Sequence, residues 1–332
     1  DNRYEGEDVM NVLLKQAESY AYTEYKGKIQ NWGYIANLSL TRFYYSQRDN
    51  HSERYGFQPS LLVSYNPVDN LHFRYHINLK NNAPSIAYLN DVEQRIDILQ
   101  TRRGNPDLKS FRSTIQDFNA IFSTGIFSID ALVSYAYEKN PIMESVIYEE
   151  GMFIHTYENQ KSFQHLAAEV TFNIKPWKDH ISLSVTPGIN RYISTGNNYL
   201  HTYTLKELRI NLDASYKNWL LSFMTITPPN RYVYGEQLLK GDLMHTLMIG
   251  YKQPAWSIMA GIHNPFMKTY RSENANWSAL NPVKSDIHST NMSNTIVVKL
   301  NFNLNFGRQY KGANKGIQNI DTDSGILQGT KE

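Results

Sequence analysis

Polar and apolar side chains alternate along residues 292–306, which read M-S-N-T-I-V-V-K-L-N-F-N-L-N-F. Successive side chains of a strand point to opposite faces, so the pattern predicts one strand with an apolar and a polar face. The apolar row is Met292, Ile296, Val298, Leu300, Phe302, Leu304 and Phe306, interrupted by Asn294. The polar row is Ser293, Thr295, Lys299, Asn301, Asn303 and Asn305, with Val297 as its apolar member. Soluble sandwich strands usually have about 5 to 6 residues, whereas a tilted membrane strand needs about 9 to 11, so the length favours a membrane strand.

The same alternation recurs upstream in pairs of segments joined by short turns. In residues 71–80 it has no exception: Leu71, Phe73, Tyr75, Ile77 and Leu79 alternate with His72, Arg74, His76, Asn78 and Lys80. The short turns lie near Gln30, Pro67, Thr124, Trp177, Asn218 and Pro254. They alternate with longer polar loops, among them 81–110, 139–161, 228–242 and 263–291. Trp32, Trp177, Trp219 and Trp256 all lie at the short-turn end. This asymmetry and the aromatic girdle are typical of barrels that cross an outer membrane.

The predicted fold is therefore all-β, a transmembrane antiparallel up-and-down β-barrel with about thirteen strands in this chain. Bacterial barrels of one chain have an even number of strands, so an odd count predicts further strands on the N-terminal side. The chain starts at Asp1 without an initiator methionine or an apolar signal segment, and we interpret it as processed or as part of a longer protein. Residues 1–306 are expected to form the C-terminal part of the barrel, and residues 307–332 a flexible tail.

Composition is compatible with this fold and excludes several function classes. The mean hydropathy of −0.51 fits a barrel, in which only alternate strand residues face lipid, and 13% aromatic residues suffice for interfacial girdles. The sequence has no apolar run of about 20 residues, so no transmembrane helix is expected. A net charge of +2 gives no electrostatic reason to expect nucleic acid as a partner. The absence of cysteine excludes disulfides, thiolate metal sites and cysteine nucleophiles.

Three segments give the chain a resemblance to the C-terminal barrel portion of TonB-dependent outer-membrane receptors of the Bacteroidetes type. They are Y-A-Y-T-E-Y-K-G-K at 20–28, R-R-G-N-P-D-L-K at 102–109 and N-F-G-R-Q-Y-K at 305–311. The second resembles the G-N-P-x-L-x-P-E segment of that family, but Ser110 and Phe111 stand where Pro and Glu are usual. The resemblance covers essentially the whole chain. It implies a barrel of about 22 strands, of which these would be the last thirteen, with an N-terminal plug and a TonB box upstream.

Candidate metal and catalytic groups have simpler explanations in the sequence. His72 and His76 lie on one strand face roughly 13 Å apart, too far to share a metal, and are expected to be ordinary lumen-facing residues. Asp321, Asp323 and Glu332 resemble part of a calcium loop, but Gly325 takes a ligand position and Ile326 takes the glycine position, which favours a turn-rich tail.

Carboxylates and basic residues on or near the strands form a second set of candidate sites. Asp117, Asp130 and Glu169 fall on different strands, where a wet barrel interior needs polar residues in any case. No nucleophile motif, H-E-x-x-H or phosphate-binding glycine loop is present in the sequence, so no catalytic residue, metal site or cofactor is expected. Arg102 and Arg103 are expected at a loop-to-strand entry, where proline fixes φ and glycine relieves a turn; a contact with plug or ligand is the alternative.

Aromatic residues gather in or near the long loops. They are Phe43, Tyr44, Tyr45, Tyr148, Tyr157, Tyr199, Tyr203, Tyr232 and Tyr234. Such rings can stack on sugars or hold a lipoprotein lid, or they can pack the loops against each other. The sequence leaves both interpretations open.

The functional prediction is uptake of a ligand through a plugged outer-membrane barrel, without catalysis. Expected partners are the N-terminal plug and barrel part of the same receptor, the TonB complex acting through that part, a surface lipoprotein and outer-membrane lipid. One alternative is a structural or assembly barrel that binds partner proteins without transport. Another is a soluble all-β binding protein, a large sandwich or propeller, against which the recurring lipid-compatible row argues.

Overall fold

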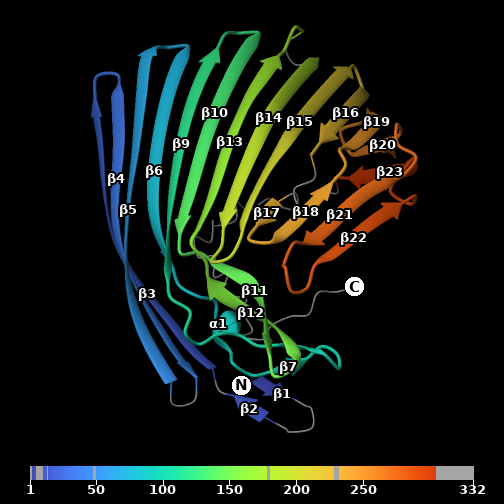
Figure 1. Ribbon diagram of the computed structural model, residues 1–332. Helices are drawn as coiled ribbons and strands as arrows, with labels where there is room; N and C mark the ends of the chain where they lie inside the picture. The colour runs from blue at the N-terminus through green and yellow to red at the C-terminus, as the bar shows by residue number, and fades with distance from the viewer. Residues whose placement is uncertain are drawn as a thin grey trace.

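One antiparallel sheet of 13 strands forms the body of this computed structural model, which describes residues 2–4, 10–12, 14–47, 50–177, 180–227 and 232–303 (Figure 1). The order across the sheet is β23-β20-β19-β16-β15-β14-β13-β10-β9-β6-β5-β4-β3, so neighbours in the sheet follow one another along the chain once the loop strands are left aside. The strands are β3 Leu14–Ile29, β4 Trp32–Gln47, β5 Asn50–Val68, β6 Leu71–Asn82, β9 Phe111–Ser123, β10 Phe127–Lys139, β13 Ser162–Ile174, β14 Ile181–Thr195, β15 Leu200–Tyr216, β16 Trp219–Ile226, β19 Met244–Lys252, β20 Trp256–His263 and β23 Thr295–Phe302. The predicted number of strands and the up-and-down order are confirmed.

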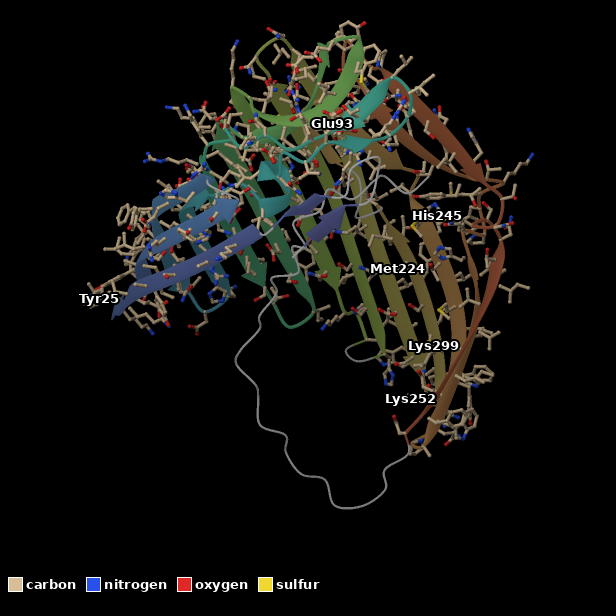
Figure 2. The ribbon with its side chains drawn as sticks, turned by 90° about the horizontal axis from the view of Figure 1, so that it is seen from below. Tyr25, Glu93, Met224, His245, Lys252 and Lys299 are labelled. Carbon is tan, nitrogen blue, oxygen red and sulfur yellow. The ribbon has the colours of Figure 1, made fainter. Side chains whose placement is uncertain are left out.

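The sheet is curved but not closed. Figure 2, seen from the long-loop end, shows it as an open trough. In the ladder of described strands, β3 pairs only with β4 and β23 only with β20, so these two strands are the edges. The six short turns predicted from the sequence lie at one end of the trough, at the top of Figure 1. The long connections lie at the other end, together with the four-residue connection 196–199 between β14 and β15.

The long connections are folded, which the sequence analysis did not predict. Two four-stranded sheets and a helical turn occupy them: β7 Gln94–Arg95, β8 Gln100–Arg102, β11 Ile142–Glu149 and β12 Met152–Asn159 in one sheet, β17 Tyr232–Tyr234, β18 Gln237–Gly241, β21 Tyr270–Asn276 and β22 Val283–Ser289 in the other, and α1 Ile86–Leu89. A further pair, β1 Asn2–Tyr4 and β2 Met10–Val12, lies in the N-terminal segment. Most of these strands are too short for periodicity to reveal them, and the eight-residue strands β11 and β12 do not alternate strictly between apolar and polar residues. They are stabilised by tertiary packing.

The strand predicted at residues 292–306 is shorter than expected. Met292 and Ser293 belong to a turn, in which Asn264 Nδ2 donates to the Met292 carbonyl at 2.6 Å and Asn294 adopts φ 53°. The left-handed backbone at Asn294 cannot continue a strand, so β23 begins only at Thr295. The predicted boundary at residue 306 and the tail 307–332 lie outside the described residues.

The two faces of the sheet have the predicted chemistry. On β23 the side chains of Ile296, Val298 and Leu300 are 77%, 61% and 57% exposed on the convex side. The register places them opposite Ile262, Ala260 and Ile258 of β20, so apolar rows on neighbouring strands merge into one band.

Aromatic rings border this band at the short-turn end. Trp32, Trp177, Trp219 and Trp256 are all exposed there, and Trp32 stacks on Tyr65 with ring centroids 4.3 Å apart. Amphipathic rings at this height are what a membrane interface favours. Among the described residues no helix is long and apolar enough to span a membrane.

Candidate ligand path

The concave face of the sheet is lined by polar side chains that bond to one another across strands. Ser134 Oγ donates to Asp117 Oδ1 at 2.6 Å, Arg209 Nη2 donates to Glu169 Oε2 at 2.5 Å, and Asn119 Nδ2 donates to Asp130. Each carboxylate singled out in the sequence therefore has a different partner. These contacts form a polar, hydrogen-bonded wall and do not bring two carboxylates together as a catalytic pair.

The two histidines also have separate partners. His72 Nδ1 lies 2.9 Å from Asn66 Oδ1, and His76 Nδ1 lies 3.5 Å from Asp117 Oδ2. Within the described ranges no group of three or more His, Cys, Asp or Glu side chains is arranged to hold a metal. The calcium-loop candidates Asp321, Asp323 and Glu332 lie outside those ranges.

A groove of about 310 Å³ crosses the concave face over β3 to β6. Tyr20 and Tyr22 form its aromatic edge, with ring centroids 5.5 Å apart, whereas Tyr25 of the same segment lies on the opposite face. The other lining residues are Glu24, Asn37, Ser39, Gln58, Ser60, Asn78 and Lys80. Exposed rings beside amide and hydroxyl groups can stack on a ligand ring and hydrogen-bond its polar substituents.

The two small sheets share a core with the inner wall of the large sheet. This core contains Met143, Phe163, Tyr192, Leu205, Val233, Leu238 and Ala275, contributed by β11, β13, β14, β15, β17, β18 and β21. Polar contacts join the small sheets: Gln237 Nε2 donates to Glu144 at 3.2 Å, and Asn281 Nδ2 donates to Gln100 at 3.2 Å. The long-loop end of the trough, here called the mouth, is thus covered by a packed assembly of the two small sheets, and their shared core is called the mouth core.

Two carboxylates of this assembly, Glu236 and Glu273, have opposite electrostatic surroundings. Burial, together with the nearby carboxylates of Glu144 and Glu158, raises the pKa of Glu236. Glu273, which is 6% exposed, accepts from Lys240 Nζ at 2.8 Å and from Arg271 Nη2 at 3.3 Å. The hydrogen bond to Glu273 raises the pKa of Lys240, which favours the charged form of Lys240.

The R-R-G-N-P segment ties α1 to β12. Gly104 N donates to the Asn90 carbonyl at 2.7 Å, Asn105 N donates to the Tyr88 carbonyl at 2.6 Å, and Asn105 Nδ2 donates to the Tyr157 carbonyl at 2.9 Å. A Cβ on Gly104 would lie 2.4 Å from the Asn90 carbonyl oxygen. The glycine is therefore required by this close backbone approach, and not by the turn conformation expected from the sequence. Arg103 pairs with Glu149 at 2.7 Å.

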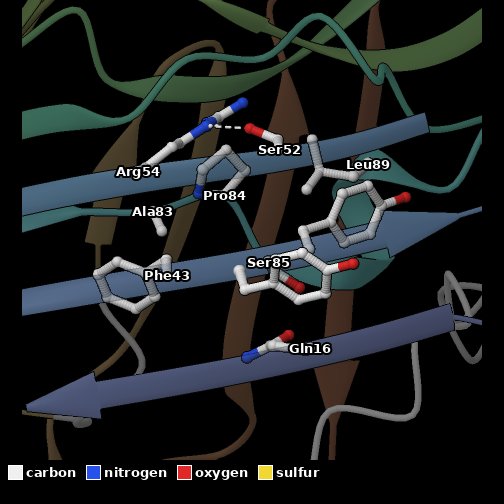
Figure 3. A pocket seen from close by; sticks show the side chains of 10 residues that line it. Gln16, Phe43, Ser52, Arg54, Ala83, Pro84, Ser85 and Leu89 are labelled. Carbon is white, nitrogen blue, oxygen red and sulfur yellow. Dashed lines mark hydrogen bonds between the residues drawn. The ribbon is translucent and has the colours of Figure 1, made fainter.

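A smaller cavity of about 150 Å³ lies near the mouth, between β3, β4, β5 and the segment before α1 (Figure 3). Its walls are Gln16, Phe43, Tyr44, Tyr45, Ser52, Arg54, Ala83, Pro84, Ser85 and Leu89. Of these, only Phe43, Tyr44 and Tyr45 were candidates from the sequence pattern. The others are single residues from distant segments and carry no local signal.

Most loop aromatics pack the loops together. Tyr157 stacks on Tyr88 with centroids 4.0 Å apart, and Tyr199, Tyr203 and Tyr234 pack against the mouth core. Tyr45 packs on a second core of Leu89, Leu108 and Ile142. Tyr148 differs, because it is 57% exposed, although its ring contacts that of Phe153. Packing is therefore the main role of these rings, and burial raises the pKa of Tyr157 and of Tyr234.

The model of the outer membrane protein beta-barrel family matches residues 11–230, which is more than half of the chain. The chain belongs to the outer membrane protein β-barrel family. It is an integral protein of the bacterial outer membrane, as the alternating rows predicted. No curated protein matches its sequence.

Solved structures of receptors and transporters share the fold of this family member. The FrpB iron transporter from Neisseria meningitidis (F5-1 variant) has a TM-score of 0.63 at 10% identity, over 87% of this chain and 46% of that one. The siderophore receptor PirA from Pseudomonas aeruginosa has a TM-score of 0.55 at 14% identity, over 90% and 59%. The copper transporter OprC has a TM-score of 0.58 at 14% identity, over 88% and 48%. The chain thus spans about half the length of these proteins.

Proposed function

We propose that this chain is the C-terminal section of a TonB-dependent outer-membrane receptor that takes up a ligand and performs no catalysis. The observation that carries the proposal is the open 13-stranded sheet, polar inside and apolar outside, in a chain that aligns with about half of each transporter chain. The free edges of β3 and β23 then pair with strands from the rest of the receptor, because an unpaired edge in lipid leaves backbone groups without partners.

In this proposal the ligand is captured at the mouth and passes along the concave wall. Cross-strand bonds such as Ser134 to Asp117 fix the wall, and the groove beside Tyr20 and Tyr22 offers a ligand both stacking and hydrogen bonds. A plug supplied by the upstream part of the receptor closes the passage, and coupling to the TonB complex supplies the energy that opens it. The cargo is not assigned, since identities of 10–14% relate folds and not substrates.

The test is the intact mass and N-terminal sequence of the protein isolated from its native membrane. We expect a mass well above 38.5 kDa and an upstream sequence with a plug and a TonB box. The purified protein should be closed in planar bilayers and should conduct once the plug is deleted. A mature mass equal to that of this chain would refute the receptor proposal.

The folded mouth favours one alternative, a barrel that binds a partner protein without transport. Two sheets with a shared core offer a fixed surface, and exposed Tyr148 is suited to a protein contact. An upstream sequence without a TonB box, together with a stable surface partner such as a lipoprotein, would support this alternative.

A further inference from the structure

A basic pocket of about 490 Å³ lies where β5 and β6 separate near the long-loop end. The ladder between the two strands ends at Ser60 and Asn78, and beyond it they are linked through side chains: Asn81 Nδ2 donates to the Tyr55 carbonyl at 3.5 Å. The pocket is lined by Arg54, Tyr55, Asn81, Lys109, Ser110, Phe111, Arg112, Lys139 and Asn140. It is distinct from the concave groove beside Tyr20.

The charge of this pocket is one-sided. Four cations line it, and none of its described lining residues is acidic. Lys109, Arg112 and Lys139 are exposed and form no ion pair with a carboxylate within the part of the chain that the structure describes. Like charges at close range repel each other, so this arrangement favours a bound anion.

The carboxylates of Glu53 and Glu138, which are next to pocket residues in the chain, are already hydrogen-bonded to other side chains. Glu53 accepts from Arg42 and from the Tyr55 hydroxyl, the latter at 2.8 Å. Glu138 faces the concave side and accepts from the Tyr234 hydroxyl at 2.9 Å. Neither one neutralises the pocket.

Two buried donors of the pocket have no hydrogen-bond partner among the residues that the structure describes. Arg54 Nη2 donates to the Leu108 carbonyl at 2.7 Å and Nε donates to Ser52 at 3.0 Å, but Nη1 is buried without a hydrogen bond. Ser110 Oγ is likewise buried without one. Buried donors are costly when unsatisfied, so both atoms indicate a missing acceptor.

The pocket lies just beyond the lipid-facing band. Arg112 of β9 and Lys139 of β10 are cross-strand partners. Phe118 and Phe122 lie on the same convex face of β9 as Arg112, and Phe127 lies on the same face of β10 as Lys139. A strand of 13 residues such as β10, tilted by about 45°, rises roughly 30 Å, slightly more than the apolar band of about 25 Å. Long loops of outer-membrane barrels are extracellular, so these two cations lie at the level of the outer-leaflet headgroups.

We propose that this pocket binds the phosphate groups of an anionic lipid of the outer leaflet. The guanidinium of Arg112 and the ammonium of Lys139 contact the phosphate oxygens from the membrane side, and Arg54 and Ser110 provide the inner donors. Tyr55 and Phe111 offer apolar contact to the rest of the headgroup. The site would anchor the barrel in its own leaflet, whatever ligand the barrel transports.

The test compares two double variants of the full-length protein in detergent. R112Q/K139Q removes two pocket cations, and R191Q/K206Q removes two exposed convex-face cations that lie outside the pocket. The probe is mixed micelles of phosphatidylcholine with a diphosphorylated glycolipid, and the comparison lipid is its dephosphorylated form. Circular dichroism and melting temperature show that both variants are folded.

We expect R112Q/K139Q to weaken binding of the diphosphorylated lipid by at least about tenfold, and R191Q/K206Q to change it by less than about threefold. The dephosphorylated lipid should bind weakly to all proteins, and millimolar inorganic phosphate should not compete. Equal losses in both variants would show a general effect of charge at the rim. Competition by inorganic phosphate would show a site for soluble anions. Either result, or no loss in R112Q/K139Q, would overturn the proposal.

Discussion

Gly104 is a residue at which the local structure of the mouth is sensitive to side-chain size. A methyl group there would lie 2.4 Å from the Asn90 carbonyl and 2.5 Å from the Tyr88 carbonyl, both of which are backbone atoms. G104A should therefore displace α1 and lower the free energy of unfolding by about 1 to 3 kcal/mol. Limited proteolysis within residues 83–110 would detect the displacement. G125A is the matched control, because a Cβ at Gly125 meets nothing within 4 Å, and equal effects would contradict the close-approach argument.

Glu236 is a residue whose charge opposes folding. Its pKa is raised by burial and by two neighbouring carboxylates, so the folded state binds its proton more tightly than the unfolded state. Its contribution to stability accordingly falls as pH rises from the ordinary glutamate value, about 4.3, through the raised value. E236Q should raise the melting temperature at pH 7, with the gain shrinking at pH 4. The control E150Q, in an exposed turn, should show no such trend.

Glu273 has the opposite character, because it is buried among cations. E273Q would leave Lys240 and Arg271 without their shared acceptor, and breaking such a network costs stability. The pKa of Lys240 is raised in the folded state, so its contribution is complete below the ordinary lysine value, about 10.4, and is lost as pH rises through the raised value. Wild-type protein should thus lose stability above about pH 10, and E273Q should lose less over that range. Parallel pH curves for the two proteins would disprove the coupling.

Among the elements, the long strands allow the sharpest test of the membrane orientation. Leu300 lies on the convex row of β23, whereas Asn301 faces the concave side, where its Nδ2 donates to Ser257 at 3.2 Å. L300R should destabilise the protein in lipid, by less than the cost of about 2 to 4 kcal/mol expected at the midplane, because Leu300 lies two residues from the level of Trp256, and N301R should cost still less. The same contrast is expected between V170R and T171R on β13. Urea unfolding in vesicles measures it, and equal costs for both rows would refute the face assignment.

The elements also show what sequence could predict and what it could not. Thirteen strands were predictable, because period-two alternation over 8 or more residues is unambiguous. Even and odd positions of a strand face opposite sides, so residue number alone places Tyr25 on the other face from Tyr20 and Tyr22. The tyrosine-rich composition of that segment conceals this difference. The mouth sheets were not predictable, since strands such as Tyr232–Tyr234 have no measurable period and depend on a shared core. Arg54 was missed for a related reason: its role depends on residues about 50 positions away, such as Leu108.

At the scale of the whole molecule, the open sheet requires a partner for two edges. In the complete receptor, the backbone amides along β3 and β23 should be as protected from hydrogen exchange as those of central strands such as β13. The physical reason is that lipid offers no hydrogen bonds to an exposed edge. Hydrogen exchange with mass spectrometry on the protein in nanodiscs measures this protection. Rapid exchange confined to the two edge strands would mean that they stay unpaired and that the barrel does not close.

The shared core of the mouth sheets determines what another organism or molecule meets at the cell surface. Residues from 139–161, 228–242 and 263–291 contribute to one folded surface, and Asn281 links it to Gln100 in yet another connection. An antibody or a bacteriophage that recognises this surface must therefore bind a conformational epitope assembled from several loops. A synthetic peptide copied from any one loop would be a poor immunogen against the native protein.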